Sequence, residues 1–358
     1  MRAAVLSTSP GQLELADVTV GPIGPREVLV RTAAAGLCHS DLHFIEGIYP
    51  HPLPVIMGHE SSGVVEAVGD QVSYLAAGDH VVTCLSMFCG QCEFCLTGKT
   101  NLCRSRATKR PDRLTGPDGD VMAQFAGLGS FAEQMVVHEN ACVKIRPDMP
   151  LDVAALLGCG VLTGIGAAWN TARVRPGDTV AVIGCGGIGL NVVQGAYVAG
   201  AARIVAVDRV PAKLELARSF GATDVVDASD GTAVDQVLAL TDGGVQHAFE
   251  AIGLAQTAQD AFAMLRADGG AYVIGMVPPT DLVSIPGAAF ISEKRIQGAM
   301  MGSNRFRVDL PRMIDLYLQG RIHLDELISA RIPLDRINQG FAEMKTGIIA
   351  RNVVVFNP

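Results

Sequence analysis

The sequence has no excess of positive charge. Its 28 Lys and Arg residues are outnumbered by 36 Asp and Glu residues, and the formal net charge is −8. Nucleic acids and anionic membranes are bound mainly through Lys and Arg side chains that neutralise phosphates, so we expect neither kind of partner. The one basic stretch, residues 99–113, is interpreted as a solvated loop, with binding of an anion or a protein partner as the alternative.

The chain also lacks the unbroken apolar core of a secretory signal peptide near its start. Polar residues interrupt the first 17 positions at Ser7, Thr8, Gln12 and Glu14, which such a leader does not tolerate. We therefore expect a cytoplasmic protein. Residues 153–172 carry no charge and are long enough for a membrane span, but four glycines in this run favour a buried segment between two domains.

Length and patterning together predict two domains of the α/β class. A chain of 358 residues is longer than a single hydrophobic core usually supports. Up to about residue 150, short apolar runs broken by Gly and Pro predict a β-rich lobe. From about residue 178, strands alternate with helices, which predicts a parallel sheet with right-handed crossovers. After about residue 301 the pattern is mixed and ends in an apolar strand, so we expect this tail to rejoin the first lobe.

Residues 179–189 place a strand directly before a G-x-G-G-x-G motif and a helix directly after it. In this context Gly184 makes the tight turn, Gly186 lets the backbone approach a pyrophosphate, and Gly189 lets the helix pack against the strand. The N-terminus of the helix then faces the phosphates. The motif predicts a dinucleotide site that also includes Gly187 and Ile188.

Asp208 decides between the two nicotinamide cofactors. It follows Gly189 by 19 positions and comes directly after the next apolar strand, where a carboxylate can accept hydrogen bonds from the adenosine ribose. Arg209 could hold the 2′-phosphate of NADP, but Asp208 would repel that phosphate, so we expect NAD. The alternative for Asp208 is a carboxylate that only caps a turn or a helix.

Nine cysteines in a reducing compartment indicate metal binding or catalysis rather than disulfides. Four of them follow the pattern C-x2-C-x2-C-x7-C and can close a tetrahedral shell around one Zn²⁺. Because no coordination position stays open, this site is expected to be structural. The alternatives are free surface thiols and a nucleic-acid zinc ribbon, which would need two separate C-x-x-C pairs and a basic chain. The four residues are Cys89, Cys92, Cys95 and Cys103.

A second candidate zinc site draws on three short motifs. Cys38 lies in G-L-C-H-S-D, His59 in G-H-E and Cys159 in G-C-G. Two thiolates and one imidazole form the three-ligand shell of a catalytic zinc and leave the fourth position for water or an alcohol. Taken singly, His59 could be a core histidine and Cys38 a buried apolar residue. The remaining cysteines are expected to pack as apolar residues: Cys84, Cys142 and Cys185.

Together these motifs give the chain a specific resemblance. In sequence order they are G-x-C-H-S-D, G-H-E, the four cysteines, G-C-G-x-x-T-G, the glycine motif with its Asp, and a late I-A-R ending at Arg351. This is the order found in the zinc-dependent alcohol dehydrogenases of the medium-chain dehydrogenase/reductase superfamily, which the chain resembles over nearly its whole length. The resemblance implies an α/β fold in which a doubly wound Rossmann sheet, residues 161–300, interrupts a GroES-like β-rich catalytic domain, residues 1–160 and 301–358.

The resemblance also implies roles for residues around the catalytic zinc. Asp41 matches the hydrogen-bond partner of His59, and Glu60 matches a carboxylate behind the metal. Ser40 matches the residue that hydrogen-bonds the alcohol, and His43 the outer end of a proton relay. The residues expected to line the substrate pocket are Tyr49, Leu85, Phe125, Met276 and Met300.

Further positions match cofactor contacts of the same family. Lys213 corresponds to a ribose contact, Arg351 to a pyrophosphate contact and Thr163 to a neighbour of the nicotinamide. His39 stands where the family often has an arginine against the pyrophosphate. Lys213 could instead be an ordinary solvated lysine, and His39 could point away from the cofactor and merely pack.

The implied function is the zinc- and NAD-dependent, reversible oxidation of a primary alcohol to an aldehyde, by hydride transfer from a zinc-bound alkoxide to NAD⁺. Ser40 is smaller than the threonine often found there, and Leu85 replaces an aromatic residue, so a bulky or benzylic alcohol is expected. The alternatives are a thiol-dependent formaldehyde dehydrogenase, which oxidises S-hydroxymethyl thiols, and a non-catalytic NAD(P)-binding protein of the same fold. By resemblance alone, we expect a homodimer or homotetramer.

Overall fold

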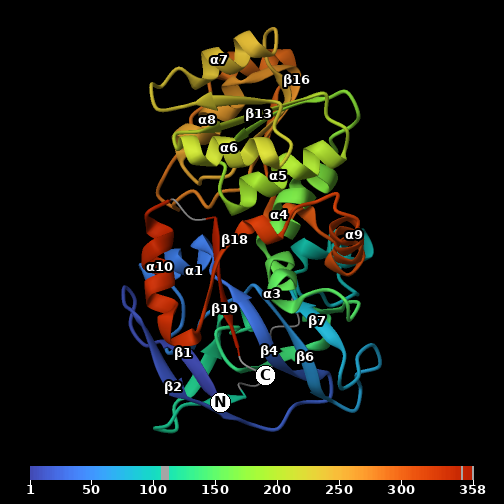
Figure 1. Ribbon diagram of the computed structural model, residues 1–358, viewed down its shortest axis with the longest axis vertical. Coiled ribbons are helices and arrows are strands. Elements are labelled where there is room, and N and C mark those ends of the chain that lie inside the picture. The colour runs from blue at the N-terminus through green and yellow to red at the C-terminus, as the bar shows by residue number, and fades with distance from the viewer. Residues whose placement is uncertain (106–112, 348–349, 357–358) are drawn as a thin grey trace. The chain divides into compact units, whose positions relative to one another are not determined.

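The computed structural model describes residues 1–105, 113–347 and 350–356 (Figure 1). The chain divides into two compact units. Met1–Gly160, Arg305–Leu318 and Leu324–Pro358 form the first unit, and Val161–Asn304 and Gln319–His323 form the second. Within the predicted basic loop, residues 106–112 lie outside the described residues.

The first unit is rich in strands. They are β1 (Arg2–Leu6), β2 (Leu13–Asp17), β3 (Thr19–Val20), β4 (Glu27–Gly36), β5 (Val55–Ile56), β6 (Ser61–Val68), β7 (His80–Thr83), β8 (Leu114–Thr115), β9 (Val121–Gln124), β10 (Gln134–His138), β11 (Cys142–Lys144), β18 (Ile328–Ile332) and β19 (Arg351–Val355). They pair in the orders β2-β1-β5-β9-β8-β3 and β11-β7-β6-β4-β19-β18, and β10 also pairs with β4.

Short helices connect these strands. They are α1 (His39–Ile45), α2 (Glu93–Leu96), η1 (Thr100–Leu102), η2 (Phe125–Gly127), η3 (Glu139–Ala141), α3 (Leu151–Ala154), η4 (Ala155–Gly158), α9 (Phe306–Leu318), η8 (Asp325–Leu327), η9 (Leu334–Arg336) and α10 (Ile337–Lys345). Only α9 is longer than ten residues among them, so this unit depends on its sheets for a scaffold.

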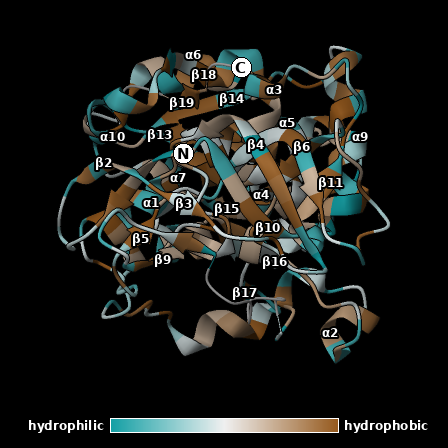
Figure 2. Cartoon of the chain, turned by 90° about the horizontal axis from the view of Figure 1, so that it is seen from below, coloured by the Kyte–Doolittle hydropathy of each residue, from teal (hydrophilic) through white to brown (hydrophobic). Residues whose placement is uncertain are grey.

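Strand β4 organises the larger sheet because apolar residues cover most of its length. Val28, Val30 and Ala34 are fully buried, and most of the strand has the brown of hydrophobic residues in Figure 2. It pairs antiparallel with β6, β10 and β19. Burying one valine side chain contributes about 1.5–3 kcal/mol, so a slip of one residue in the register would lose that energy at several positions. Because β19 comes from the end of the chain, the C-terminal tail is part of this sheet.

The second unit holds one six-stranded sheet. Its strands are β12 (Thr179–Ile183), β13 (Arg203–Asp208), β14 (Asp224–Asp227), β15 (Val245–Glu250), β16 (Leu265–Val273) and β17 (Arg295–Gly298). Its helices are α4 (Gly160–Gly166), η5 (Ala167–Ala172), α5 (Gly187–Val198), α6 (Pro211–Ser219), α7 (Ala233–Leu240), α8 (Ala255–Ala263), η6 (Gly287–Ser292) and η7 (Met300–Ser303).

The sheet of the second unit is parallel and carries helices on both faces. Its order is β14-β13-β12-β15-β16-β17, and the pairs are parallel. Val237 of α7 and Phe262 of α8 share an apolar cluster with Ile183 and Val207 of the sheet, so these helices cover one face. Helices α5 and α6 pack against β12, β13 and β14 on the other face (Figure 1). This doubly wound arrangement confirms the predicted fold class.

The uncharged run at residues 153–172 folds into the short helices α3, η4, α4 and η5. Within the described part of the chain, no single helix is both long and apolar enough to cross a membrane, although the bent pair Leu151–Gly158 and Gly160–Ala172 passes the same test when its halves are joined. Leu157, Leu162 and Ile165 of this run are fully buried within the protein. The run is therefore buried, as its composition predicted.

Candidate active site and metal centres

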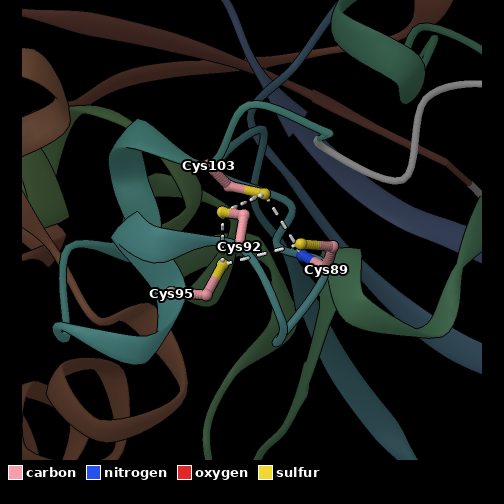
Figure 3. Close-up of side chains that lie close together, drawn as sticks. All are labelled: Cys89, Cys92, Cys95 and Cys103. Atoms are coloured by element: carbon pink, nitrogen blue, oxygen red, sulfur yellow. Dashed lines mark hydrogen bonds between the residues drawn. The ribbon is translucent and has the colours of Figure 1, made fainter.

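Four cysteines gather in the lobe that contains α2 and η1, with their sulfur atoms turned toward one another (Figure 3). The Sγ atoms of Cys89 and Cys95 are 3.9 Å apart, those of Cys92 and Cys95 are 3.5 Å apart, and those of Cys92 and Cys103 are 3.9 Å apart. Around a tetrahedral zinc with Zn–S bonds of about 2.3 Å, neighbouring sulfurs lie about 3.8 Å apart. The four side chains therefore fit one zinc ion as they stand.

Backbone N–H groups favour thiolates in this lobe, and the thiolate is the form that binds metal. The N–H groups of Cys95 and Arg104 lower the pKa of Cys92 to about 6. The N–H groups of Gln91 and Cys92 lower the pKa of Cys89. Burial acts in the opposite direction on Cys95 and raises its pKa to about 12. The backbone of this short segment therefore favours the thiolate form of Cys89 and Cys92 without a contribution from distant residues.

The second set of ligands unites three segments that lie far apart in the sequence. Cys38 directly precedes α1, His59 lies between β5 and β6, and Cys159 lies between η4 and α4. Their ligand atoms all lie within 4.8 Å of one another, and His59 Nε2 is 3.3 Å from Cys159 Sγ. All three side chains are at most 4% exposed. Two thiolates and one imidazole at these distances fit a zinc ion whose fourth position remains open.

Asp41 orients the imidazole of His59. Asp41 Oδ1 lies 3.0 Å from His59 Nδ1, and Asp41 Oδ2 accepts a hydrogen bond from the Cys38 N–H at 3.3 Å. A proton on Nδ1 satisfies the first contact and leaves the lone pair of Nε2 for a metal. Burial is the largest single influence and would lower the pKa of His59, but the negative charges of Asp41 and Cys38 and the hydrogen bonds to both together outweigh it and raise the pKa. The structure brings Asp41 and His59 into the partnership that the resemblance implied, while their catalytic roles remain predictions.

The charges around this set suit a divalent cation. A hydrogen bond from Cys159 lowers the pKa of Cys38, and the positive charge of Arg351 lowers it further. The fully buried carboxylate of Glu60 lies nearby, where burial raises its pKa to about 7 against the opposing effect of Arg351. Buried acidic groups repel one another unless a cation offsets their charge. Zn²⁺ would supply that charge among ligands of the type it prefers.

Glu60 and Arg351 form an ion pair behind the ligand set. Glu60 Oε2 accepts a hydrogen bond from the Gly160 N–H at 3.1 Å, and Glu60 Oε1 lies 3.7 Å from Arg351 Nε. Arg351 also donates to the Leu37 carbonyl oxygen at 2.9 Å. A side chain at position 36 would collide with the Glu60 carboxylate, so Glu60 can take this position only because residue 36 is glycine. Arg351 therefore lies against the metal ligands, and its expected contact with the pyrophosphate remains a prediction.

Helix α1 carries the two residues of the expected proton relay. Ser40 and His43 are one turn apart, so their side chains share a face of the helix. His43 Nδ1 is buried and has no hydrogen-bond partner within the described residues. The His43 ring stacks on Tyr49 with 6.1 Å between ring centroids. His39 opens the same helix and is exposed. Helix α1 thus places the His43 imidazole one turn away from Ser40.

Aromatic rings gather beside His59. The Phe125 ring packs against His59 at 5.7 Å and edge-on against Phe44 at 4.8 Å between centroids. His51 lies 5.4 Å from Phe125. Phe125 is one of the predicted pocket residues, whereas Phe44 and His51 are not. The i, i+4 spacing of Ser40 and Phe44 on one helix was a signal that could have revealed Phe44.

The other predicted pocket residues lie in different surroundings. Leu85 packs, half-buried, against an apolar cluster of the first unit that includes Val81 and Leu128. Met276 and Met300 belong to the second unit, where Met276 follows β16 and is half-buried and Met300 is 41% exposed. Their joint presence in one pocket remains a prediction.

The glycine motif follows β12 in the second unit. Gly184 has a φ of +92°, which favours glycine, and it makes the turn that ends the strand. Gly186 is the residue before α5, and the helix begins at Gly187 and continues through Ile188. A side chain on Gly189 would collide with the Gly184 carbonyl oxygen, so the helix can approach the turn only with glycine there. An added Cβ on Gly186 would have no atom within 4 Å, so a phosphate can approach the N-terminus of α5 at this residue.

Asp208 is held directly beside this motif. Its Oδ2 accepts a hydrogen bond from the Cys185 N–H at 2.8 Å, and its Oδ1 accepts one from the Val210 N–H at 3.0 Å. Each carboxylate oxygen can accept a second bond, so ribose hydroxyls can still be bound. Arg209 next to it is exposed, and Lys213 lies on α6 and is half-buried.

Thr163 lies on α4 of the same unit and is buried. Its hydroxyl donates to Met301 Sδ at 3.5 Å. Its expected place beside the nicotinamide remains a prediction.

Comparison with known proteins agrees with these features. A family model described as the alcohol dehydrogenase GroES-like domain matches residues 24–150, and one described as zinc-binding dehydrogenase matches residues 187–319. The S-(hydroxymethyl)glutathione dehydrogenase of Photobacterium damsela subsp. piscicida is 40% identical to this chain over 99% of both proteins. The alcohol dehydrogenase class-3 of Myxine glutinosa is 38% identical over 99% of this chain and 97% of that protein.

This chain belongs to the zinc-dependent alcohol dehydrogenases of the medium-chain dehydrogenase/reductase superfamily. A solved structure of benzyl alcohol dehydrogenase from Acinetobacter calcoaceticus matches this dehydrogenase with a TM-score of 0.93 at 32% identity, over 99% of both chains. The predicted family and enzyme class are confirmed. The cofactors are NAD and zinc, with one structural site of four cysteines and one catalytic site of two cysteines and a histidine.

The names of the relatives bear on the expected substrate. Several proteins similar to this dehydrogenase are named for the oxidation of an S-hydroxymethyl thiol. That name matches the alternative raised from the sequence better than the benzylic alcohol expected there.

Proposed function

We propose that this dehydrogenase oxidises a primary hydroxyl group with NAD⁺, and that its substrate is the S-hydroxymethyl adduct of a small thiol. The observation that carries the proposed activity is the buried set of Cys38, His59 and Cys159, a complete three-ligand shell in a chain that also has a dinucleotide motif. The choice of substrate is supported by relatives of that name at 37–40% identity over at least 98% of this chain.

The reaction converts R–S–CH2–OH and NAD⁺ into R–S–CHO, NADH and a proton. The carbon loses a hydride and the hydroxyl loses a proton, so the thioester product is one two-electron step more oxidised than the substrate. When bound, zinc supplies a Lewis acid that acidifies the hydroxyl, and NAD⁺ supplies the hydride acceptor. Asp41 holds the ligand His59 in orientation, and Ser40 and His43 are the inner and outer ends of the expected proton relay through the nicotinamide ribose.

A second candidate substrate is a benzylic alcohol. It is favoured by the rings of Phe44 and Phe125 beside His59, because an aromatic pair contributes about 0.5–1.5 kcal/mol beyond the burial of its area. The likeness to a solved benzyl alcohol dehydrogenase points in the same direction.

A comparison of substrates under one set of conditions tests the proposal. NADH formation by the zinc-loaded enzyme would be followed with formaldehyde plus glutathione, formaldehyde plus a second small thiol, formaldehyde alone, benzyl alcohol and ethanol. We expect the highest kcat/KM with formaldehyde and one of the thiols, and none with formaldehyde alone. A kcat/KM for benzyl alcohol that exceeds the value for both thiol adducts would replace the first candidate by the second.

Phe125→Leu provides a matched control for the two candidates. It removes the ring beside His59 but keeps an apolar side chain, so activity on benzyl alcohol should fall by about tenfold or less, and the activity on the thiol adduct should change little. Metal analysis separates both candidates from a non-catalytic NAD(P)-binding protein, because two zincs per chain fit an enzyme and one zinc fits a binding protein.

We also propose a cytoplasmic, homodimeric or homotetrameric enzyme. All nine cysteines are free thiols, which fits a reducing compartment. Strand β17 is the edge of its sheet, and Leu282 and Ile291 are 82% and 86% exposed in the segment before it. An open edge and exposed apolar side chains favour association between copies. A monomer mass by light scattering at working concentration would contradict this assembly.

A further inference from the structure

Four polar side chains form a row across the amino end of the sheet in the second unit. Asp178 directly precedes β12, His247 lies near the start of β15, and Arg295 begins β17. Gly270 of β16 is in register with both His247 and Arg295. A Cβ on Gly270 would lie only 2.5 Å from the hydroxyl of Tyr272, so that hydroxyl completes the row. The glycine motif follows the other end of β12, so this His247 row is separate from the motif, and it contains no zinc ligand.

Hydrogen bonds run along the His247 row in one direction. The Asp178 carboxylate only accepts, so His247 Nε2 carries a proton and donates to Asp178 Oδ2 at 3.0 Å. His247 Nδ1 lies 3.4 Å from the Tyr272 hydroxyl, which donates to it when the imidazole is neutral. The Arg295 guanidinium only donates, and it bonds to the oxygen of the Tyr272 hydroxyl. Each contact in the row therefore has one donor and one acceptor when His247 is neutral.

Both ends of the row are fixed to the backbone. Asp178 Oδ2 also accepts a hydrogen bond from the Arg175 N–H at 2.8 Å. At the other end, Arg295 donates to the carbonyl oxygen of Asp268 at 3.1 Å and to its carboxylate at 2.9 Å. The row thus joins the turn before β12 to the strands β15, β16 and β17.

Protonation of His247 disturbs this order of donors and acceptors. Nδ1 then carries a proton that points at the Tyr272 oxygen, which already accepts a hydrogen bond from Arg295. The Tyr272 hydroxyl proton must turn away from His247, although Tyr272 is only 3% exposed and His247 only 7%. A buried donor that loses its acceptor destabilises the folded protein.

The charged groups around His247 act in both directions. Burial is the largest influence and lowers the pKa of His247, whereas the hydrogen bond to Asp178 and its negative charge raise it. The positive charges of Arg295 and of Arg266 on β16 lower it again, and the net result is a lowered pKa. Asp268 forms an ion pair with Arg295. The folded protein therefore holds a proton on His247 less tightly than the unfolded chain does.

We propose that the His247 row is an acid-sensitive lock on the second unit: neutral His247 holds the amino ends of β12, β15, β16 and β17 together, and its protonation releases them. The unfolded chain takes up this proton near about pH 6.5. The stability that the row supplies is therefore complete above about pH 6.5 and is lost as the pH falls from there through the folded pKa. Acid should loosen the unit that carries the dinucleotide motif, whichever hydroxyl group the enzyme oxidises.

The first test measures melting temperatures of the zinc-loaded enzyme and two variants between about pH 8 and about pH 5.5. His247→Gln keeps a donor for Asp178 but takes up no proton. The parent enzyme should lose about 3 °C or more beyond the loss of His247→Gln over this range. His323→Gln is the matched control, because it makes the same change at an exposed histidine of the same unit, and it should follow the parent.

Tyr272→Phe examines the other side of the same contact. It removes the hydroxyl that favours neutral His247, so it should lower the melting temperature at about pH 8 and reduce the further loss in acid. Parallel pH profiles of the parent and His247→Gln would overturn the lock. So would a His323→Gln variant that is as insensitive to acid as His247→Gln.

If His247→Gln does not fold, hydrogen exchange of the parent enzyme still decides the question. Exchange of backbone amides, corrected for the intrinsic effect of pH, would be compared between about pH 7.5 and about pH 5.5. Acid should speed exchange by about tenfold in peptides that cover residues 178–182, 245–250 and 268–273, and by less elsewhere. An equal rise in all peptides, a rise confined to the first unit, or no rise would contradict the lock.

Discussion

The structural and the catalytic zinc sites differ in how their ligands are brought together. The structural ligands lie within residues 89–103, in a lobe whose helix α2 has no buried residue. The catalytic ligands come from positions 38, 59 and 159 and are at most 4% exposed. A lobe without a core of its own depends on its metal for folding energy. A site supported by a buried sheet is instead shaped by the fold before the metal arrives.

Loss of a catalytic ligand should have the largest effect on turnover. Cys38→Ala or Cys159→Ala leaves a two-ligand shell, so kcat/KM should fall by about three decades or more, as expected for the several kcal/mol that a Lewis-acid metal contributes. The melting temperature should fall by less than about 5 °C, because the sheet forms without the metal. We would measure kcat/KM, zinc content and melting temperature on the same preparations of each variant.

A matched control for these variants is Cys84→Ala, which removes a buried cysteine that belongs to neither ligand set. It should keep two zincs per chain and most of the activity. Unfolding of Cys38→Ala at room temperature would contradict a catalytic site that is shaped by the fold.

Loss of a structural ligand should act mainly on folding. Cys95→Ala removes one of four thiolates from the lobe, so the lobe should become open to limited proteolysis and the melting temperature should fall by about 5 °C or more. The catalytic zinc should stay bound. A protease-resistant lobe in Cys95→Ala that has lost its zinc would show that the metal is not what orders this segment.

Removal of the partner of His59 should have an intermediate effect on the metal. Asp41→Asn weakens the hold on His59 Nδ1, and loss of such a partner typically lowers metal affinity by about 10–100-fold. Competition with a chelator should show this loss at the catalytic site only, because the ligands of the structural site include no histidine. If the chelator removes both zincs equally well from Asp41→Asn, Asp41 does not act on the catalytic site alone.

The smallest effect is expected for an ion pair on the surface of the structural lobe. Arg104 lies 2.8 Å from Glu93, but the two side chains are 71% and 61% exposed. Exposed pairs contribute about 0–1 kcal/mol, so Arg104→Ala should shift the melting temperature by about 2 °C or less. If Arg104→Ala lowers the melting temperature as much as Cys95→Ala does, surface contacts stabilise the lobe more than its metal does.

Much of this molecule was predictable because its signals are local. The C-x2-C-x2-C-x7-C spacing brings four thiols together within one lobe, and the glycine motif with Asp208 needs only a strand, a turn and a helix. The return of the C-terminal tail to the first lobe was expected from its mixed pattern and final apolar strand, but its pairing with β4 was seen only in the structure. The aromatic group was harder to predict, because Phe44 of α1, His51 and Phe125 of η2 come from separate segments that meet only in the folded unit.

The sequence by itself determined which chemical groups are available and which nearby residues along the chain form a site together. Spacing decides such questions because a turn or a helix brings residues a few positions apart into contact whatever surrounds it. Only the tertiary structure decided that Arg351 lies against Glu60 and that His247 meets Asp178. These contacts join segments far apart in the sequence, or depend on which loops meet at one edge of a sheet. Their strength comes from burial, which strengthens electrostatic interactions by removing water and arises only when the whole unit has folded.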